Sequence, residues 1–579
     1  MEEGLEKSSR PKRDRRWRRE AGPILILLLL TGGIHAWIIR HTELPARDGV
    51  GFMRYAWRLQ HEPWGDVLRT SHQHPGYPLT IATASKLLPF GNLSLCDRML
   101  LSAQLVNLAA GCLLAVAMFY LGKELFNPRV GFWTAALFQC LPVAARITSD
   151  ALSEATFLLT ATVTLLLAVR SLRDYSIWRL GLCGACGGCC FLIRPEGAGP
   201  VVAVLAVLLG LQAVARWRRP WRQVLPAAAS LTVAAALVAS PYVAVLGNLT
   251  NKPTGQAVIG LAQRKIEDGG LRIEDRGTKI NRSFDLQSSV FDPQHLVWGV
   301  WWHGDREGDW LEHVAWGAWA VIEEVVRGFA YFALLPTVLG LYWFRGQWRS
   351  RPEICLLGIL CLLQALILCR VGLVVGYVSE RHVLIIVLCG LYWAVWAVLT
   401  LPQRWWLAKN PELRIEDRRS NIEDCKEPSS SILHPQSSIF DPRSSILSAG
   451  ILVIFMLACL PVCLQPLHAG QVGHREAGLW LALHTQPGDI IVDPFDWSSL
   501  YAGSVFQHET PVAGLSNQRP VQYVVLEANC KPHPELILLP VAKRLAADGQ
   551  LVFDWQPNRR QLRHKAQEVQ IFAVPITSQ

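Results

Sequence analysis

The sequence predicts a polytopic α-helical membrane protein that ends in a small soluble α/β domain. Of its 579 residues, 51% are hydrophobic, and they are gathered in runs long enough to cross a bilayer. Its 23 tryptophans often lie near the ends of these runs, where they anchor helices at the membrane interface. The net charge of +10 comes largely from basic residues in short connections between runs. Such placement is a signal of membrane topology, so we expect no nucleic-acid partner.

The chain opens with a polar, Arg- and Lys-rich segment, residues 1–20, followed by an apolar run. This start resembles a signal peptide but lacks an evident small-residue cleavage site. We therefore expect an uncleaved first helix with a cytoplasmic N-terminus, and a membrane region over residues 21–465. About eleven spans are expected, each near the length needed to cross a bilayer. They are 21–39, 100–121, 130–145, 151–169, 180–193, 197–215, 224–246, 326–344, 354–369, 382–401 and 448–464.

The connections between these runs indicate the orientation. Basic residues fall in alternate short connections, which the positive-inside rule places on the side of the N-terminus. These residues are Lys123, Arg129, Arg170, Arg173, Arg179, Arg216, Arg218, Arg219, Arg222, Arg345, Arg349, Arg351, Arg404 and Lys409. The opposite, external side then receives the segments 47–78, 146–150, 194–196, 247–324 and 376–381, and everything after about residue 465.

Two polar, Ser-rich segments resemble each other. Residues 265–293 and 413–447 share near-copies of RIED and of SSxFDP. Both contain too little apolar surface for a core, so we expect low-complexity inserts without a function.

The C-terminal region, residues 466–579, alternates helix and strand patterns. Helices are expected at 477–484 and 534–547, and strands at 488–493, 521–528, 551–555 and 569–574. This alternation predicts a small α/β layer on the external side.

The first external segment carries the first candidate site. Residues 47–78 contain Asp48, His74, Tyr55 and Tyr77 within an amphipathic stretch that ends in a His-Pro turn. Aromatic side chains there sit at headgroup depth, where a carboxylate meets lipid-borne and water-borne substrates together. The alternative is a solvated loop with a chance Asp.

A second acidic site lies in RITSDALSEATF, where Asp150 and Glu154 are four residues apart. On one helix this spacing places both carboxylates on one face. Capping of the helix explains Asp150 equally well. It does not explain Glu154, because a charge one turn deeper in an apolar span is costly and usually functional.

The third set is cationic. Arg194 lies in LIRPEG, and Glu380 and Arg381 lie in YVSERH, at the external ends of apolar runs. Such arginines either snorkel to headgroups or bind the phosphate of a lipid-linked substrate through two hydrogen bonds.

In their order along the chain, these residues resemble the C-type (GT-C) membrane glycosyltransferase superfamily. The resemblance is to bacterial protein O-mannosyltransferase-like enzymes and to lipid A aminoarabinose transferases. It rests on an Asp in the first external loop, the turn HPGYP, the acidic SDALSE, an RPEG turn, a late SERH and a soluble α/β tail. HPGYP departs from the His-Pro-Pro run that many relatives have. The resemblance covers most of the chain outside the two inserts.

The resemblance implies a polyprenyl-phosphate sugar as donor and an external acceptor hydroxyl on a lipid, glycan or protein. The attacking hydroxyl needs a base, for which Asp48 is the candidate. Arg381 or Arg194 would stabilise the departing phosphate. Asp150 and Glu154 would orient the acceptor, the sugar or a metal. The resemblance determines no cofactor, and a divalent metal stays open. The remaining residues assigned to substrate positioning are His74, Tyr77, Tyr55 and Glu380.

We expect the protein in a bacterial inner membrane, with the lipid-linked donor, membrane lipids and the acceptor as its partners. Two other functions stay open at this point. A transporter or flippase of a lipid-linked sugar also carries charges inside the membrane, although no inverted repeat is evident. A non-catalytic scaffold or sensor would use the tail as a binding module.

Overall fold

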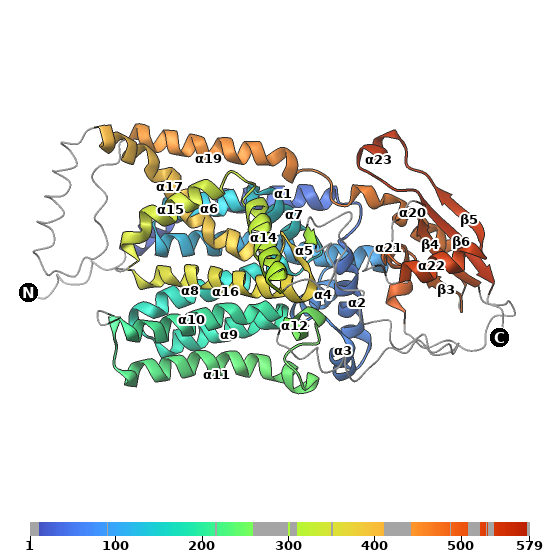
Figure 1. Cartoon of the computed structure of the whole chain (residues 1–579), viewed down its shortest axis with the longest axis horizontal. Helices are drawn as coiled ribbons and strands as arrows, with labels where there is room; N and C mark the ends of the chain where they lie inside the picture. The colour runs from blue at the N-terminus through green and yellow to red at the C-terminus, as the bar shows by residue number, and fades with distance from the viewer. Residues whose placement is uncertain are drawn as a thin grey trace, which may run out of the picture.

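The computed structural model describes residues 11–89, 91–214, 217–258, 299–301, 310–348, 351–409, 442–486, 488–507, 521–528, 530, 536 and 538–575. A bundle of long helices makes up most of the chain, and a small sheet domain lies at one end of it (Figure 1). The bundle region comprises α1 (Pro11–Arg40), α2 (Arg47–His61), α3 (Trp64–Thr70), α4 (Gly76–Leu87), α5 (Leu95–Leu125), α6 (Pro128–Cys140), α7 (Pro142–Ser149), α8 (Glu154–Asp174), α9 (Ile177–Ile193), α10 (Ala198–Gly210), α11 (Trp221–Leu246), α12 (Pro253–Val258), α14 (Trp310–Gly328), α15 (Leu334–Phe344), α16 (Pro352–Val375), α17 (Leu384–Lys409) and α19 (Pro442–Cys463).

Eight helices in the described part of the chain are long and apolar enough to cross a membrane. They are Glu20–Arg40, Leu95–Leu125, Glu154–Asp174, Pro195–Ala213, Trp221–Leu246, Pro352–Val375, Leu384–Pro402 and Ile446–Cys463. The pair α6 and α7 adds a ninth span if counted as one, bent by 71° where Pro142 opens α7. The shorter apolar helix α9 lies among them. The chain is therefore a multi-pass integral membrane protein.

One expected span is wrong. The run 326–344 is not one helix, because α14 ends at Gly328 and α15 begins at Leu334. Between them Ala330 and Tyr331 have φ values of 49° and 66°, a left-handed conformation that a helix cannot continue through. The expected external loop 247–324 instead contains most of α14.

The two expected inserts lie outside the described residues, except for the last six residues of the second. Residues 442–447 belong to α19, which begins at Pro442 rather than at the expected 448. The polar, Ser-rich composition of this stretch hides the start of the helix.

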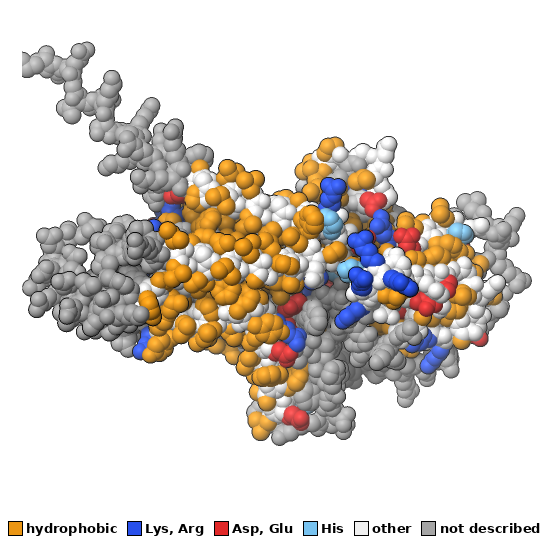
Figure 2. Space-filling view, turned by 90° about the horizontal axis from the view of Figure 1, so that it is seen from above, with side chains coloured by type: hydrophobic (Ala, Val, Ile, Leu, Met, Phe, Trp, Pro, Cys, Tyr) orange, Lys and Arg blue, Asp and Glu red, His pale blue; other side chains and the backbone are white. Residues whose placement is uncertain are grey.

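The bundle is packed through small residues and covered with apolar ones. In α9, a Cβ atom at Gly184 would collide with the backbone of Leu231 in α11, so glycine permits this close approach. Large side chains such as Leu29, Leu237 and Leu457 are more than half exposed, and the visible surface of the bundle is largely hydrophobic (Figure 2). Such a surface is stable in lipid rather than in water.

The ends of the bundle differ as the basic connections predict. The described N-terminal end of the chain and the connections from α10 to α11 and from α15 to α16 lie at one end (Figure 1). The helices α2, α3 and α4 and the sheet domain lie at the other end, on the side expected to be external.

The C-terminal part forms a mixed four-stranded sheet in the order β3-β4-β6-β5. Its strands are β3 (Ile490–Val492), β4 (Val521–Glu527), β5 (Gln550–Trp555) and β6 (Val569–Pro575), with helices α20 (Val472–His484), α21 (Trp497–Tyr501), α22 (Leu538–Ala547) and α23 (Arg559–Arg563). β3 pairs parallel to β4, and the other two pairings are antiparallel. Valines and isoleucines of β4 and β6 bury the inner faces against α20 and α22. The expected α/β layer is confirmed.

Candidate active site

The first external helix, α2, presents Asp48 in its first turn. Its apolar residues are spaced to bury one side, including Phe52 and Met53, which fixes the rotation of the helix. Gly49 lies against the break between α7 and α8, because a Cβ there would stand 2.8 Å from the carbonyl oxygen of Ala151. Asp48 is thereby held at a closely packed junction of the bundle.

Asp48 forms an ion pair with Arg381, with Oδ2 lying 2.5 Å from Nη1. Arg381 follows the short strand β2 (Tyr377–Ser379), which pairs antiparallel with β1 (Gly299–Trp301). The turn is held because Gln364 donates a hydrogen bond of 3.2 Å to the carbonyl of His382. The side chains of Asp48 and Arg381 are 15% and 9% exposed, respectively. Residues 333 positions apart in the sequence thus form one largely buried pair.

A second charged group lies beside the first. Nη1 of Arg194 is 2.5 Å from Oε1 of Glu154, and its Nε is 3.5 Å from Glu196. Nζ of Lys252 is 3.9 Å from the other oxygen of Glu196. Burial lowers the pKa of Lys252, and the carboxylate of Glu196 opposes that change.

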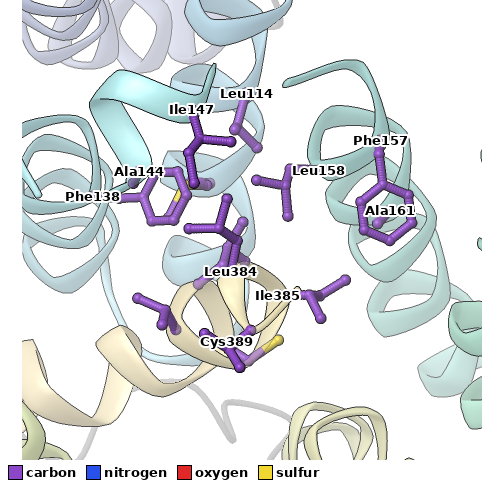
Figure 3. Close-up of a cluster of buried hydrophobic side chains, with 14 of the residues drawn as sticks. Leu114, Phe138, Ala144, Ile147, Phe157, Leu158, Ala161, Leu384, Ile385 and Cys389 are labelled. Atoms are coloured by element: carbon purple, nitrogen blue, oxygen red, sulfur yellow. The ribbon is translucent and has the colours of Figure 1, made fainter. Parts of the chain in front are cut away.

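One pocket is lined by members of both groups. Its polar lining consists of Glu154, Arg194, Glu196, Gln364, Arg381 and His382. Its apolar lining consists of Phe157, Leu158, Leu384 and Ile385. These apolar residues come from the first turns of α8 and α17 and continue into the buried cluster below (Figure 3). The pocket is polar on one side and continuous with the hydrophobic core on the other.

Two buried atoms of the pocket residues lack a hydrogen-bond partner within the described part of the chain. They are Oε2 of Glu154, an acceptor, and Nε of Arg381, a donor. Buried polar atoms are normally paired, so this pocket can bind a ligand that offers both a donor and an acceptor. Burial and the neighbouring arginines lower the pKa of His382 well below its usual range, so this side chain adds no positive charge.

Asp150 and Glu154 do not share a helical face. Asp150 follows the last residue of α7, and α8 begins only at Glu154, so the spacing argument fails. The Asp150 carboxylate instead accepts hydrogen bonds from the backbone N–H groups of Ala46 and Ala151, and it lies 2.6 Å from Nε2 of His468. Only Glu154 of this pair lines the pocket.

The residues of the His-Pro turn lie behind the pocket. His74 is buried, with Nδ1 2.7 Å from the carbonyl of Phe191 and Nε2 2.9 Å from the hydroxyl of Thr250. Burial lowers its pKa to about 4, so it is neutral. Through these contacts His74 joins the segments that carry Arg194 and Lys252.

The two tyrosines pack inside the protein. The hydroxyl of Tyr77 is buried and accepts a hydrogen bond of 3.1 Å from Asn107. Tyr55 packs with Leu59 and Val67 on the α3 side of α2. Neither residue lines the pocket.

Glu380 lies next to Arg381 but outside the pocket lining. Burial raises its pKa to about 7, and the nearby guanidinium groups of Arg146 and Arg327 oppose this rise. Its charge therefore changes within the physiological pH range.

The described residues contain no cluster of three or more metal-ligating side chains. The polar lining of the pocket contains two arginines, Arg194 and Arg381. It also contains two glutamates, Glu154 and Glu196, so the numbers of basic and acidic side chains are equal.

Sequence reasoning missed four residues around this site. Glu196, within the quoted RPEG, and His382, within SERH, were visible in the motifs but given no role. Lys252 lies in a loop without a motif. His468 lies after the last span, and the sequence contains no signal that joins it to Asp150.

Comparisons with known proteins find similarity in one stretch of the sequence and in the fold. Residues 91–244 match the family model of dolichyl-phosphate-mannose-protein mannosyltransferases. No curated protein matches the chain in sequence. The structure of ArnT from Cupriavidus metallidurans bound to undecaprenyl phosphate is similar over 95% of this chain and 97% of that one, with a TM-score of 0.50 and 12% identity.

The apo oligosaccharyltransferase of Archaeoglobus fulgidus is similar over 83% of this chain, with a TM-score of 0.51 and 12% identity. The present chain spans 64% of the length of that protein. At this identity the likeness shows the fold. In that fold, and in the sequence of residues 91–244, the chain is similar to C-type (GT-C) membrane glycosyltransferases.

Proposed function

We propose that the protein transfers a sugar, of the hexosyl type, from a polyprenyl-phosphate donor to an acceptor hydroxyl on the external side of a bacterial inner membrane. The observation that carries this proposal is the pocket between Asp48–Arg381 and Glu154–Arg194. It combines cations with an apolar lining of Phe157, Leu158, Leu384 and Ile385. A lipid phosphate combines the same two properties, an anionic head and a hydrocarbon chain.

The cations suit the donor phosphate in both its bound and its departing form. As the bond from the anomeric carbon to the phosphate oxygen breaks, the phosphate gains negative charge. Among the described residues, Nε of Arg381 is a donor without a partner, and Nζ of Lys252 has one ion pair, a long one of 3.9 Å to Glu196. Fixed cations in a site of low dielectric stabilise such developing charge most effectively.

Asp48 is our candidate for the general base. The acceptor hydroxyl attacks the anomeric carbon and gives its proton to the carboxylate, so the products are the glycosylated acceptor and polyprenyl phosphate. The ion pair with Arg381 holds this carboxylate next to the position of the phosphate.

Glu154 is our candidate for sugar recognition. Its Oε1 is held by Arg194, while Oε2 has no partner within the described chain. A fixed carboxylate with one available oxygen is suited to accept a hydrogen bond from a sugar hydroxyl. Asp150, which already has three hydrogen-bonding neighbours, is better suited to holding the backbone than to chemistry.

Transport of a lipid-linked sugar is less well supported. The apolar side chains below the pocket pack against one another in the core (Figure 3). An enzyme needs only the external opening.

Binding of undecaprenyl phosphate, the part that donors of this class share in bacteria, tests the proposal. We expect thermal stabilisation of the purified protein by undecaprenyl phosphate, and at least a several-fold weaker dissociation constant for Lys252→Gln, since a charge-assisted contact contributes about 1.5–3 kcal/mol. Lys86→Gln, an exposed lysine of α4, is the matched control and should bind normally. Equal binding by all three proteins, or none by the wild type, would contradict the proposal.

A further inference from the structure

The carboxylate of Asp150 is completely engaged. Oδ1 accepts from the N–H of Ala46 at 3.1 Å and from the N–H of Ala151 at 2.7 Å. Oδ2 lies 2.6 Å from Nε2 of His468. The side chains of Asp150 and His468 are 4% and 5% exposed. A charge-assisted hydrogen bond in such a buried setting is among the stronger contacts in a protein.

His468 lies in the connection from the last membrane helix to the C-terminal sheet. Its φ of 52° is left-handed, a conformation that is uncommon for a non-glycine residue and raises its energy. The ring that makes this contact therefore sits on a backbone held in an unfavourable shape. Such strain is typical of positions with a function.

The same C-terminal part holds the residues just before α2. The indole N–H of Trp497 donates to the carbonyl of Pro45 at 3.0 Å. Arg47 forms an ion pair with Asp496 at 3.1 Å. The start of α2 is thus held by hydrogen bonds and ion pairs from two sides. One side is the helix break that carries Asp150, and the other is the C-terminal domain.

Ala46 is the residue that precedes α2, and its side chain supplies no cap. The N–H of Ala46, two residues before Asp48, instead donates to the Asp150 carboxylate from another part of the chain. A shift of Ala46 therefore moves Asp48. The contact between His468 and Asp150 joins the C-terminal part of the chain to this arrangement from the side of the helix break, in addition to the contacts of Trp497 and Asp496.

We propose that His468 is a positioning residue that, through Asp150, sets the location of the Asp48 carboxylate and makes transfer depend on the docked C-terminal domain. This inference rests on the proposed function for its kinetic part. Donor binding involves Arg381, Arg194 and Lys252, none of which His468 contacts. Loss of the His468 contact should therefore lower kcat and leave KM for the donor nearly unchanged.

The test compares three substitutions in the full-length protein. His468→Ala and His468→Phe remove the ring nitrogen, and His468→Phe keeps most of the volume if the smaller side chain destabilises the fold. His468→Gln places an amide N–H near the position of Nε2 and should recover most of the activity. His484→Ala, an exposed histidine of α20, is the matched control.

Two measurements are made on each variant. We expect kcat to fall about 10- to 100-fold in the Ala and Phe variants, since the loss of a hydrogen bond to a charged group costs about 1.5–3 kcal/mol. Hydrogen exchange, followed by mass spectrometry, should become faster at the amides of residues 46–50 and stay unchanged in β4 and β6.

The two measurements separate the proposals. If the wild type transfers no sugar, the proposed function fails, and the exchange at residues 46–50 still decides whether His468 holds α2. Wild-type exchange at residues 46–50 in His468→Phe would overturn the inference. A proportional rise in KM instead of a fall in kcat would overturn it too.

Discussion

Replacing Asp48 by Asn separates its two roles, because Asp48 is both the candidate base and the partner of a buried arginine. Asn keeps the shape and one oxygen acceptor for Arg381 but cannot take a proton. A general base contributes about 10²- to 10⁴-fold in rate, which is about 3–5 kcal/mol of transition-state free energy. We expect transfer to fall by this factor.

The structural cost of the same change should be smaller. With the Asp48 and Arg381 side chains 15% and 9% exposed, removing the negative charge leaves a largely buried cation less well paired. Because Asn retains an acceptor, we expect a loss of about 1–3 kcal/mol in the free energy of unfolding. The variant should therefore be folded, slightly less stable and nearly inactive.

The double variant Asp48→Asn/Arg381→Gln then distinguishes base from ion pair. It removes both charges, so it should recover thermal stability without recovering transfer. The assay is sugar transfer from a polyprenyl-phosphate donor in proteoliposomes, with Asp66→Asn in α3, 68% exposed, as the control carboxylate. Transfer above one tenth of the wild-type rate in Asp48→Asn would refute the reasoning, and the base would then be sought at Glu154 or Asp150.

Two further predictions follow from the packing and the buried charge around the site. Gly49→Ala should displace the start of α2, because its Cβ would stand 2.8 Å from the oxygen of Ala151. We expect a loss of about 1–3 kcal/mol in the free energy of unfolding and of most of the transfer activity. The control Gly65→Ala in α3, where the nearest atom is in the Arg69 side chain at 3.8 Å, should leave stability and activity unchanged. Glu380→Gln should flatten the pH dependence of the melting temperature: burial raises the folded pKa from 4.5 to about 7, so the wild type is relatively stabilised below pH 4.5 and loses that contribution as pH rises through 7. Parallel melting curves of wild type and Glu380→Gln against pH would contradict this assignment.

Much of the architecture follows from hydropathy alone. Apolar runs of membrane length, basic connections on alternate sides and period-2 strands in the tail predicted the helical bundle and its terminal sheet. The break at Ala330 and Tyr331 escaped prediction because both residues are apolar and neither is Gly or Pro. A left-handed turn inside a hydrophobic run leaves no mark on a hydropathy pattern.

The candidate site was predicted only in part, because local motifs indicate single residues but not contacts between distant segments. Motifs at helix ends pointed to Asp48, Glu154, Arg194 and Arg381, which the fold brings around one pocket. The location of Asp150 was misjudged, because a four-residue spacing implies a shared face only if the helix is continuous, and α8 begins after it. Its partner His468 depends on a contact between residues 318 positions apart, which local pattern reasoning has no means to detect.

The first turns of α8 and α17 end at the pocket, where Glu154 opens one helix and Leu384 opens the other. Each helix start carries a partial positive charge from backbone N–H groups that have no partner within the helix, equivalent to roughly half an elementary charge. Two such ends directed at one pocket add a backbone contribution to the potential that the side chains create. This contribution cannot be removed by any side-chain substitution. The pocket should therefore keep a residual attraction for anions when one of its cations is replaced. Anion binding by such a variant should still weaken as the salt concentration rises.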